Sequence, residues 1–395
     1  MKEQLLFVID SLNIGGAEKS LVALLNMIDS SKYDVDLLLF KKGGELDKYL
    51  PHYINLLPQP EYFMYLNQRN AINKHFLLYK IKTSIALRIN NFNNKPIHSE
   101  QVVYRSIQNI LPTLEKKYDA AIAYSQGMPT YFVSNKVKAN KKLAWINTDY
   151  INTLYHKEID YQSYKNIDSI ITVSNYTKES VSNTNEEYKG KVELILDIIN
   201  PSTIIEMAKE DGGSEIDRSV IKLLTVGRLE KVKAYDKAIK AAKLLKDSNF
   251  KFKWYVIGDG AEKQNLEQMI NQHDLDEEFI LLGKKENPYP YIKACDIYIQ
   301  TSAKEGFGLT VMEAKILKKA IVCTDFPTAK EIINHEIDGL IVEHDIKSIY
   351  QGIRRYLKND VFKKSIENAL ERSKPYSSIN QITKFYNLIE RGDSN

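Results

Sequence analysis

Short apolar runs alternate along the chain with stretches in which apolar residues recur every three or four positions. Runs of the first kind are typical of buried parallel strands, and stretches of the second kind are typical of helices. Because the two kinds alternate, the pattern predicts an α/β fold with parallel sheets covered by helices on both faces. The expected strands cover residues 5–10, 35–40, 120–124, 142–146, 169–173 and 192–196, followed by 221–226, 252–257, 279–282, 296–300, 320–323 and 339–342.

One polar passage separates these strands into two groups. It contains Asn200-Pro201 and the run Asp211-Gly-Gly-Ser214, and such stretches mark domain boundaries. At 395 residues the chain is long enough for two domains with full cores. We therefore expect a first domain over residues 1–200 and a second over residues 201–375.

The composition is that of an ordinary globular protein, with 27% charged and 43% hydrophobic residues. The net charge of +4, from 55 basic and 51 acidic residues, is too small to favour nucleic acid as a partner. Cys295 and Cys323 lie beside strand-like residues, which predicts buried thiols in a reduced compartment. Because no signal peptide precedes the first strand and no apolar run reaches the ~18 residues of a membrane span, we expect a cytosolic protein or one on the inner face of a membrane.

One segment departs from this balance of charge. Between residues 66 and 117, nine basic residues stand against Glu100 and Glu115, a net charge of +7. Residues 70–94 within it form an expected helix with one apolar face, made of Leu78, Ile81, Ile85, Ile89 and Phe92. Two interpretations stay open: this face packs against the core, or the segment contacts anionic lipid or a phosphate-linked acceptor.

The stretch Ser302–Ala314 lies between an expected strand and an expected helix from Thr310. Gly306 and Gly308 permit a sharp turn there and allow the backbone to approach a ligand. The first amides of the helix would face that ligand, as in anion sites that take phosphate or diphosphate. Glu305 and Glu313 bracket the turn, and their carboxylates would accept hydrogen bonds from the hydroxyls of a sugar nucleotide.

The interval Glu305–Glu313 resembles the E-x7-E signature of family-4 retaining glycosyltransferases of the GT-B fold. The resemblance implies two Rossmann-like domains with parallel sheets facing across a cleft, and a C-terminal helix (376–395) that returns to the first domain. It also implies a nucleotide-sugar donor on the second domain and a glycan or lipid-phosphate-linked acceptor on the first. The nucleotide sugar is then a substrate, and no cofactor is expected. Within this resemblance, Glu313 would accept from the ribose hydroxyls and Glu305 would lie near the transferred sugar.

Other notable residues of the second domain also follow expected strands. They are Gly227-Arg228, Gly258-Asp-Gly260 and Gly283, and ligands of open parallel sheets bind beyond the carboxyl ends of the strands. Arg228 and Lys233 would stabilise the departing diphosphate, Arg as a fork and Lys as a point charge. The run from Gly227 is similar to a segment of the family that holds the diphosphate, with Lys233 the better match than Lys231 and with Ala234 in place of the usual glycine.

The first domain contributes a second glycine turn, Gly15-Gly16, after its first strand. A dehydrogenase is disfavoured there because G-x-G-x-x-G is absent and Asp34 and Asp36 stand at the wrong end of the second strand. The turn instead resembles the glycine loop that contacts the donor diphosphate in the family. Asn147 occupies a position where similar enzymes commonly have a histidine that touches the donor sugar.

Together with these observations, the resemblance implies a metal-independent retaining glycosyltransferase that uses a nucleoside-diphosphate sugar, expected to be UDP-linked; the expectation of a role in bacterial cell-surface polysaccharide synthesis rests on the resemblance alone. No metal is expected, because the D-x-D strings at Asp34 and Asp274 lack a third ligand at suitable spacing. A sugar-nucleotide epimerase of the same fold and a catalytically silent binding partner remain as alternatives. The expected catalytic residues are Arg228, Lys233 and Glu305, and the expected donor-binding residues are Gly15, Gly16, Asn147, Gly227, Gly258, Gly306, Phe307, Gly308, Leu309, Thr310 and Glu313.

Overall fold

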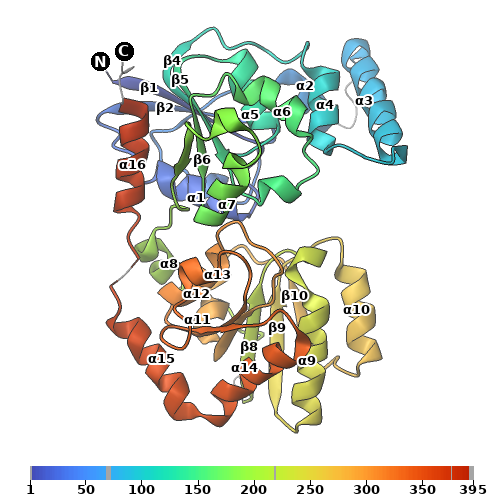
Figure 1. The fold of residues 1–395 in the computed structure, drawn as a ribbon, viewed down its shortest axis with the longest axis vertical. Coiled ribbons are helices and arrows are strands. Elements are labelled where there is room, and N and C mark those ends of the chain that lie inside the picture. The colour runs from blue at the N-terminus through green and yellow to red at the C-terminus, as the bar shows by residue number, and fades with distance from the viewer. Residues whose placement is uncertain (1, 68–72, 218, 375, 391–395) are drawn as a thin grey trace. The chain divides into compact units, whose positions relative to one another are not determined.

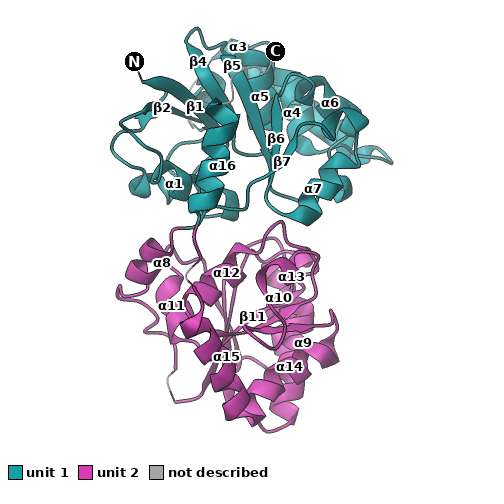
Figure 2. Ribbon diagram, turned by 60° about the vertical axis from the view of Figure 1, so that its left-hand side comes forward, with its two compact units in different colours: residues 1–199, 378–395 teal, residues 200–377 magenta. Residues whose placement is uncertain are grey.

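The computed structural model describes residues 2–67, 73–217, 219–374 and 376–390. These divide into two compact units, each built around its own sheet (Figures 1 and 2). Unit 1 comprises Met1–Ile199 and Ser378–Asn395, and unit 2 comprises Asn200–Ser377. The boundaries expected at residues 200 and 376 lie within two residues of these divisions.

Unit 1 contains a seven-stranded parallel sheet in the order β3-β2-β1-β4-β5-β6-β7. The two-residue strand β3 (Asn55–Leu56) was not predicted, because it is too short to leave an apolar run. The other strands are β1 (Glu3–Ile9), β2 (Tyr33–Leu39), β4 (Lys117–Ala123), β5 (Lys138–Ile146), β6 (Ser169–Thr172) and β7 (Val192–Leu194). Its helices are α1 (Gly16–Leu25), α2 (Glu61–Asn67), α3 (Lys74–Phe92), α4 (Ser99–Ile107), α5 (Met128–Lys136), α6 (Lys157–Tyr164), α7 (Asn175–Ser182) and α16 (Ile379–Glu390).

Unit 2 contains a six-stranded parallel sheet in the order β10-β9-β8-β11-β12-β13. Its strands are β8 (Ile221–Val226), β9 (Phe252–Ile257), β10 (Phe279–Gly283), β11 (Ile297–Gln300), β12 (Ala320–Thr324) and β13 (Leu340–Val342). Its helices are α8 (Pro201–Met207), α9 (Tyr235–Asp247), α10 (Lys263–Gln272), α11 (Tyr289–Ala294), α12 (Leu309–Ile316), α13 (Ala329–Ile332), α14 (Ile346–Lys358) and α15 (Asp360–Arg372). All six strands correspond to predicted ones, because parallel strands buried on both faces read as continuous apolar runs.

Each core is made of the apolar strand residues and the inward faces of the helices. Trp145 in unit 1 is 1% exposed and Trp254 in unit 2 is fully buried. Cys295 and Cys323 are both buried and free, as predicted.

The C-terminal helix α16 packs on the unit 1 sheet. The Phe385 ring lies 6.0 Å from Phe7 and 6.2 Å from Trp145, measured between ring centroids. Where the chain leaves and rejoins unit 1, the Ser378 hydroxyl donates to Ile199 O at 2.8 Å and accepts from Ile199 N at 2.9 Å. The last part of the expected helical tail, residues 391–395, lies outside the described residues.

Helix α3 contradicts the interpretation that its apolar face packs against the core. The predicted stripe is there, but its members are exposed by 48–89%: Leu78, Ile81, Ile85, Ile89 and Phe92. The buried positions are instead Thr83 and Asn90, and α3 packs against α4. Figure 1 shows α3 at the outer edge of unit 1, with α4 on one side of it. The first expected residues of this helix, 70–72, lie outside the described residues.

Candidate active site

The expected site residues of unit 2 follow the carboxyl ends of three neighbouring strands. Gly227 and Arg228 come directly after β8, Gly258 comes after β9, and Glu305–Gly308 follow β11. Because β9, β8 and β11 are adjacent in a parallel sheet, these loops share one edge, where ligands of such sheets bind.

Gly258 is required by the close approach of the β8 and β9 loops. It has φ +154°, and a Cβ there would lie 1.9 Å from Gly227 O. A Cβ at Gly260 would lie 2.5 Å from Leu229 O. Only glycine fits such contacts, so the two loops pack backbone against backbone at the candidate site.

Lys233 and Glu305 form an ion pair that joins the β8 and β11 loops. The Lys233 Nζ lies 2.7 Å from Glu305 Oε1 and 2.8 Å from Oε2, and the side chains are only 16% and 12% exposed. Thr301 Oγ1 also donates to Lys233 O at 2.8 Å. Ala234, which follows, adopts the left-handed conformation (φ +51°), which accounts for the glycine usual at this position. Lys231 is exposed, so the structure selects Lys233 as the buried cation.

Two neutral residues that were not predicted complete the surroundings of Glu305. The Gln300 amide and the Ser302 hydroxyl each donate to Glu305 Oε1 at 2.6 Å. With Lys233, these donors hold one carboxylate in place. Their position at the end of β11 and just after it was the one available signal in the sequence.

Helix α12 begins at the predicted glycine turn. Its N-cap residue, Gly308, has φ +101° and ψ 44° and offers no side chain to the first amides. Phe307 is buried beside it at 3% exposure, while Leu309 and Thr310 in the first turn are partly exposed. An anion beyond this turn would meet backbone amides and the positive end of the helix dipole.

Glu313 lies one turn further along α12 and is 2% exposed. Its Oε1 accepts a hydrogen bond from the Tyr289 hydroxyl at 2.9 Å. Tyr289, at the start of α11, was not predicted, because an aromatic residue before an apolar run reads as core. The carboxylate is thus held by a neighbouring helix of the same unit.

Arg228 is not drawn into this cluster. Its guanidinium pairs with Glu230 at 3.0 Å, and the Arg228 side chain is 72% exposed. The structure therefore brings Lys233 and Glu305 together and leaves Arg228, five positions before Lys233, at the surface.

The expected site residues of unit 1 lie at the carboxyl ends of its own strands. Gly15 caps α1, which begins at Gly16, and its backbone is extended (φ −157°). Asn147 follows β5; its Nδ2 donates to Tyr124 O at 3.1 Å and its backbone N donates to Gln126 Oε1 at 3.2 Å. These bonds give Asn147 a structural role within unit 1.

The D-x-D string of the second strand is used in side-chain contacts. Asp36 accepts from Asn55 Nδ2 at 2.7 Å, from Tyr118 OH at 2.8 Å and from Lys116 Nζ at 2.9 Å. Among the described residues, no group of three or more His, Cys, Asp or Glu side chains is arranged to hold a metal ion.

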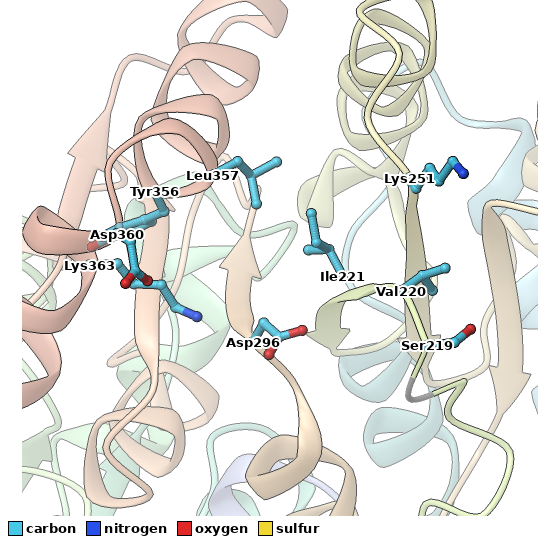
Figure 3. A pocket seen from close by; sticks show the side chains of 9 residues that line it. All are labelled: Ser219, Val220, Ile221, Lys251, Asp296, Tyr356, Leu357, Asp360 and Lys363. Atoms are coloured by element: carbon cyan, nitrogen blue, oxygen red, sulfur yellow. The ribbon is translucent and has the colours of Figure 1, made fainter.

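A cavity of about 390 Å³ opens at the opposite end of the unit 2 sheet. Ile221 at the start of β8 and Asp296 just before β11 line it, together with Tyr356 and Lys363 (Figure 3). Because the candidate site residues follow the carboxyl ends of the strands, this cavity is not part of the candidate site.

Comparison with known proteins identifies the domain that carries the Lys233–Glu305 pair. Residues 207–373 match the family Glycosyl transferases group 1. A relative in Campylobacter jejuni, an N-acetylgalactosamine-N,N'-diacetylbacillosaminyl-diphospho-undecaprenol 4-alpha-N-acetylgalactosaminyltransferase, is 28% identical over 93% of this chain and 94% of its own length. The poly(ribitol-phosphate) alpha-N-acetylglucosaminyltransferase of Staphylococcus aureus is 24% identical over 62% of this chain and 52% of its own length.

Solved structures show the same fold over the whole chain. TarM of S. aureus, in complex with UDP among other ligands, superposes with a TM-score of 0.69 at 16% identity, covering 98% of this chain and 100% of that one. HepE of Anabaena, in complex with UDP-glucose, has a TM-score of 0.69 at 14% identity and covers 97% and 98% of the two chains. Both predicted features, the two Rossmann-like units and the GT-B architecture, are confirmed. Residues 207–373 therefore match the glycosyl transferases group 1 family, and the chain as a whole has the GT-B fold of these solved structures.

Proposed function

We propose that the protein is a metal-independent retaining glycosyltransferase of family 4 that moves a hexosyl-type sugar from a UDP-sugar to a glycan, lipid-phosphate-linked or teichoic-type acceptor in bacterial cell-surface polysaccharide synthesis. The observation that carries the proposal is the buried pair of Lys233 and Glu305 beside the uncapped start of α12. Unit 2 would hold the donor and unit 1 the acceptor.

The pair provides a cation where the leaving group gains charge. When the bond between the sugar C1 and the diphosphate oxygen breaks, the electron pair leaves with the nucleoside diphosphate. Lys233 and the first amides of α12 would stabilise that negative charge, and they are already in place before the reaction. The acceptor hydroxyl then bonds to C1 on the same face, and its proton passes to the departing phosphate.

The carboxylates would serve two different parts of the donor. Glu305, oriented by Gln300 and Ser302, would accept from the sugar and stabilise positive charge at C1. Glu313 would accept from the ribose, in exchange for its present bond to Tyr289.

The relatives support the choice of donor and acceptor. The C. jejuni relative is named for a diphospho-undecaprenol substrate and the S. aureus relative for poly(ribitol-phosphate); structural neighbours are bound to UDP or UDP-glucose. We further propose a cytoplasmic enzyme attached peripherally to the inner membrane face through the basic segment 66–117. Among the described residues no helix is long and apolar enough to cross a membrane.

The test is donor hydrolysis by the purified full chain with a panel of UDP-sugars, with and without EDTA. We expect slow release of free sugar that EDTA does not reduce, and an α-linked product by NMR when a UDP-α-sugar and an accepted glycan are supplied. An isomeric UDP-sugar as product would instead identify an epimerase, and no turnover of any donor would contradict the proposal.

A further inference from the structure

We propose that the outward face of α3 is a docking surface for a membrane that contains anionic lipids, with its apolar side chains inserted among the lipid headgroups and acyl chains. The inference rests on the proposed peripheral attachment and names the surface that makes it. We call this surface the α3 stripe; it consists of Leu78, Ile81, Ile85, Ile89 and Phe92.

The α3 stripe concentrates exposed apolar side chains in one place. Sixteen large hydrophobic residues are exposed among the described residues, and six of them lie on α3: the stripe itself and Leu77. Phe92 is 89% exposed and Leu78 66%. Single exposed apolar residues need no explanation, but a contiguous set marks a binding surface.

The stripe is not the face through which α3 packs on the rest of unit 1. At ~100° per residue, the five stripe residues fall within an arc of about 80°, and the buried Thr83 and Asn90 lie roughly 150° away. Asn90 is committed there, since its Nδ2 donates to Ile97 O at 2.8 Å and its Oδ1 accepts from Ile97 N at 3.0 Å. The helix therefore packs through the face that carries Thr83 and Asn90 together with Phe76 and Tyr79, which are partly buried against the unit 1 core. It presents a second apolar face outward, unlike a surface helix with a single apolar face.

Cations accompany the stripe, and acidic residues do not. Lys74, Lys80, Lys82 and Arg88 lie on α3, and there is no Asp or Glu between Glu61 and Glu100. On the same helical projection, Lys82 borders one edge of the stripe and Arg88 borders the other, each about 20° beyond it, while Lys80 lies roughly 100° from the nearer edge. Long basic side chains in such places can reach anionic headgroups while their methylene groups stay on the apolar side.

This charge pattern selects the occupant. Two copies meeting through their stripes would bring like charges together without a compensating carboxylate, which disfavours a dimer. A surface of anionic lipid supplies both the negative charge and the apolar layer. At 19 residues α3 is ~28 Å long, so lying in the plane of the interface it would immerse the whole stripe.

The test is co-sedimentation of the full chain with vesicles of phosphatidylcholine mixed with phosphatidylglycerol, compared with phosphatidylcholine alone. The decisive variant is Ile85→Ser/Ile89→Ser, with Ile337→Ser/Val361→Ser as the matched control, because those unit 2 residues are 62% and 81% exposed. We expect partition to fall by about tenfold for each isoleucine removed. The control should bind like the wild type, and the exposed positions predict unchanged melting temperatures.

A charge variant separates the two contributions. Lys82→Gln/Arg88→Gln should weaken binding to the phosphatidylglycerol vesicles and reduce its dependence on salt, while binding to phosphatidylcholine alone changes little. Wild-type protein that stays in the supernatant at low salt, or an isoleucine variant that binds like the wild type, would overturn the proposal. A dimer in light scattering that the isoleucine variant abolishes, without vesicle binding, would assign the stripe to a second copy instead.

Donor hydrolysis without vesicles keeps this inference apart from the proposed function. The α3 variants should hydrolyse UDP-sugars at the wild-type rate. Hydrolysis without vesicle binding would refute the docking surface alone, whereas vesicle binding without any donor turnover would refute the transferase chemistry alone.

Discussion

Unit 1 and unit 2 are both parallel sheets covered by helices, but their carboxylates have different surroundings. In unit 1, burial raises the pKa of Asp197 to about 7 and also raises the pKa of Asp160, which accepts from Gln101 and from two tyrosines. In unit 2, hydrogen bonds from Lys285 and Tyr291 lower the pKa of Glu215 to about 2. The two unit 1 acids are thus harder to ionise because they are buried, whereas Glu215 of unit 2 is easier to ionise because it is paired with a cation.

The difference directs attention to unit 2, which contains the buried ion pair of the candidate site. Glu305 of unit 2 is mostly buried and ion-paired with Lys233. The match to the glycosyl transferases group 1 family, residues 207–373, lies entirely within unit 2. The strand ends of unit 1 instead hold Asn147 through hydrogen bonds that it donates to Tyr124 O and Gln126 Oε1. Unit 1 differs further in presenting an apolar helix face to the surroundings.

The largest effect we expect is from Lys233→Ala, which should reduce kcat by ~10²–10³ with a smaller change in donor affinity, because the lost charge acts most on the departing phosphate. Lys231→Ala is the matched control, since Lys231 is exposed two positions away, and it should stay near wild type. Steady-state kinetics with UDP-sugars would measure both. If Lys231→Ala were inactive while Lys233→Ala stayed active, the catalytic cation would be Lys231 and not the lysine of the buried pair.

Asp197→Asn should stabilise unit 1 at pH 8 by on the order of 4 kcal/mol. The folded-state pKa of about 7 exceeds that of an unfolded aspartate, so the wild type loses stability as pH rises from ~4 to ~7. The variant lacks this loss, and the unfolding free energies of the two proteins should become equal near pH 4.

The chain offers a probe for each unit, because its two tryptophans, Trp145 and Trp254, are both buried and lie one in each. Urea unfolding in a Trp254→Phe background follows unit 1. Asp217→Asn in unit 2 should have the opposite sign at neutral pH, because hydrogen bonds from Ser219 lower the pKa of Asp217 to about 2; a Trp145→Phe background follows it. If the two substitutions changed the free energy of unfolding in the same direction, the contrast between the units would be wrong.

Asn147→Ala should cost unit 1 about 1 kcal/mol of unfolding free energy, the usual value of one hydrogen bond, through loss of the bond to Tyr124 O. The variant Asn147→His tests whether this residue also contributes to the choice of donor sugar. Kinetics with several UDP-sugars would show a changed order of preference if it does. An unchanged order, with only the urea midpoint moved, would leave Asn147 purely structural.

The smallest effect we expect is from Ala234→Gly, a gain of ~0.5–1 kcal/mol in the stability of unit 2. Relief of the left-handed backbone (φ +51°) is worth ~1–2 kcal/mol, and the greater freedom of glycine in the unfolded chain offsets part of it. Ala234 is 5% exposed, so a destabilised variant would mean that packing of its methyl group outweighs the relieved strain.

The sequence predicted the strands and the loops that follow them better than it predicted the hydrogen-bond partners of the residues in those loops. Charged residues and glycines after apolar runs stand out, which is why Lys233, Glu305 and Gly308 were predicted as site residues. Gln300, Ser302 and Tyr289 are neutral hydrogen-bond partners, and nothing in spacing or charge distinguishes such residues from ordinary core or loop positions.

Helix α3 shows a different limit. Its three-four periodicity was read correctly, and the structure confirms that the five apolar residues share a face. Periodicity does not say which face has a neighbour, however, because that depends on where α4 lies. The covered face carries Thr83 and Asn90 with the partly buried Phe76 and Tyr79. When a helix has apolar residues on two faces, periodicity alone does not show which face is covered.

The place of α16 has a consequence for synthesis. Unit 2 is inserted within unit 1, so the chain completes unit 2 at Ser377 before the segment that closes unit 1 has been made. Unit 2 holds all of its strands in one continuous stretch and can fold as soon as that stretch has left the ribosome. Unit 1 must wait with the sheet around Phe7 and Trp145 uncovered until Phe385 arrives. The order of maturation on the ribosome is therefore unit 2 first, although its sequence comes second.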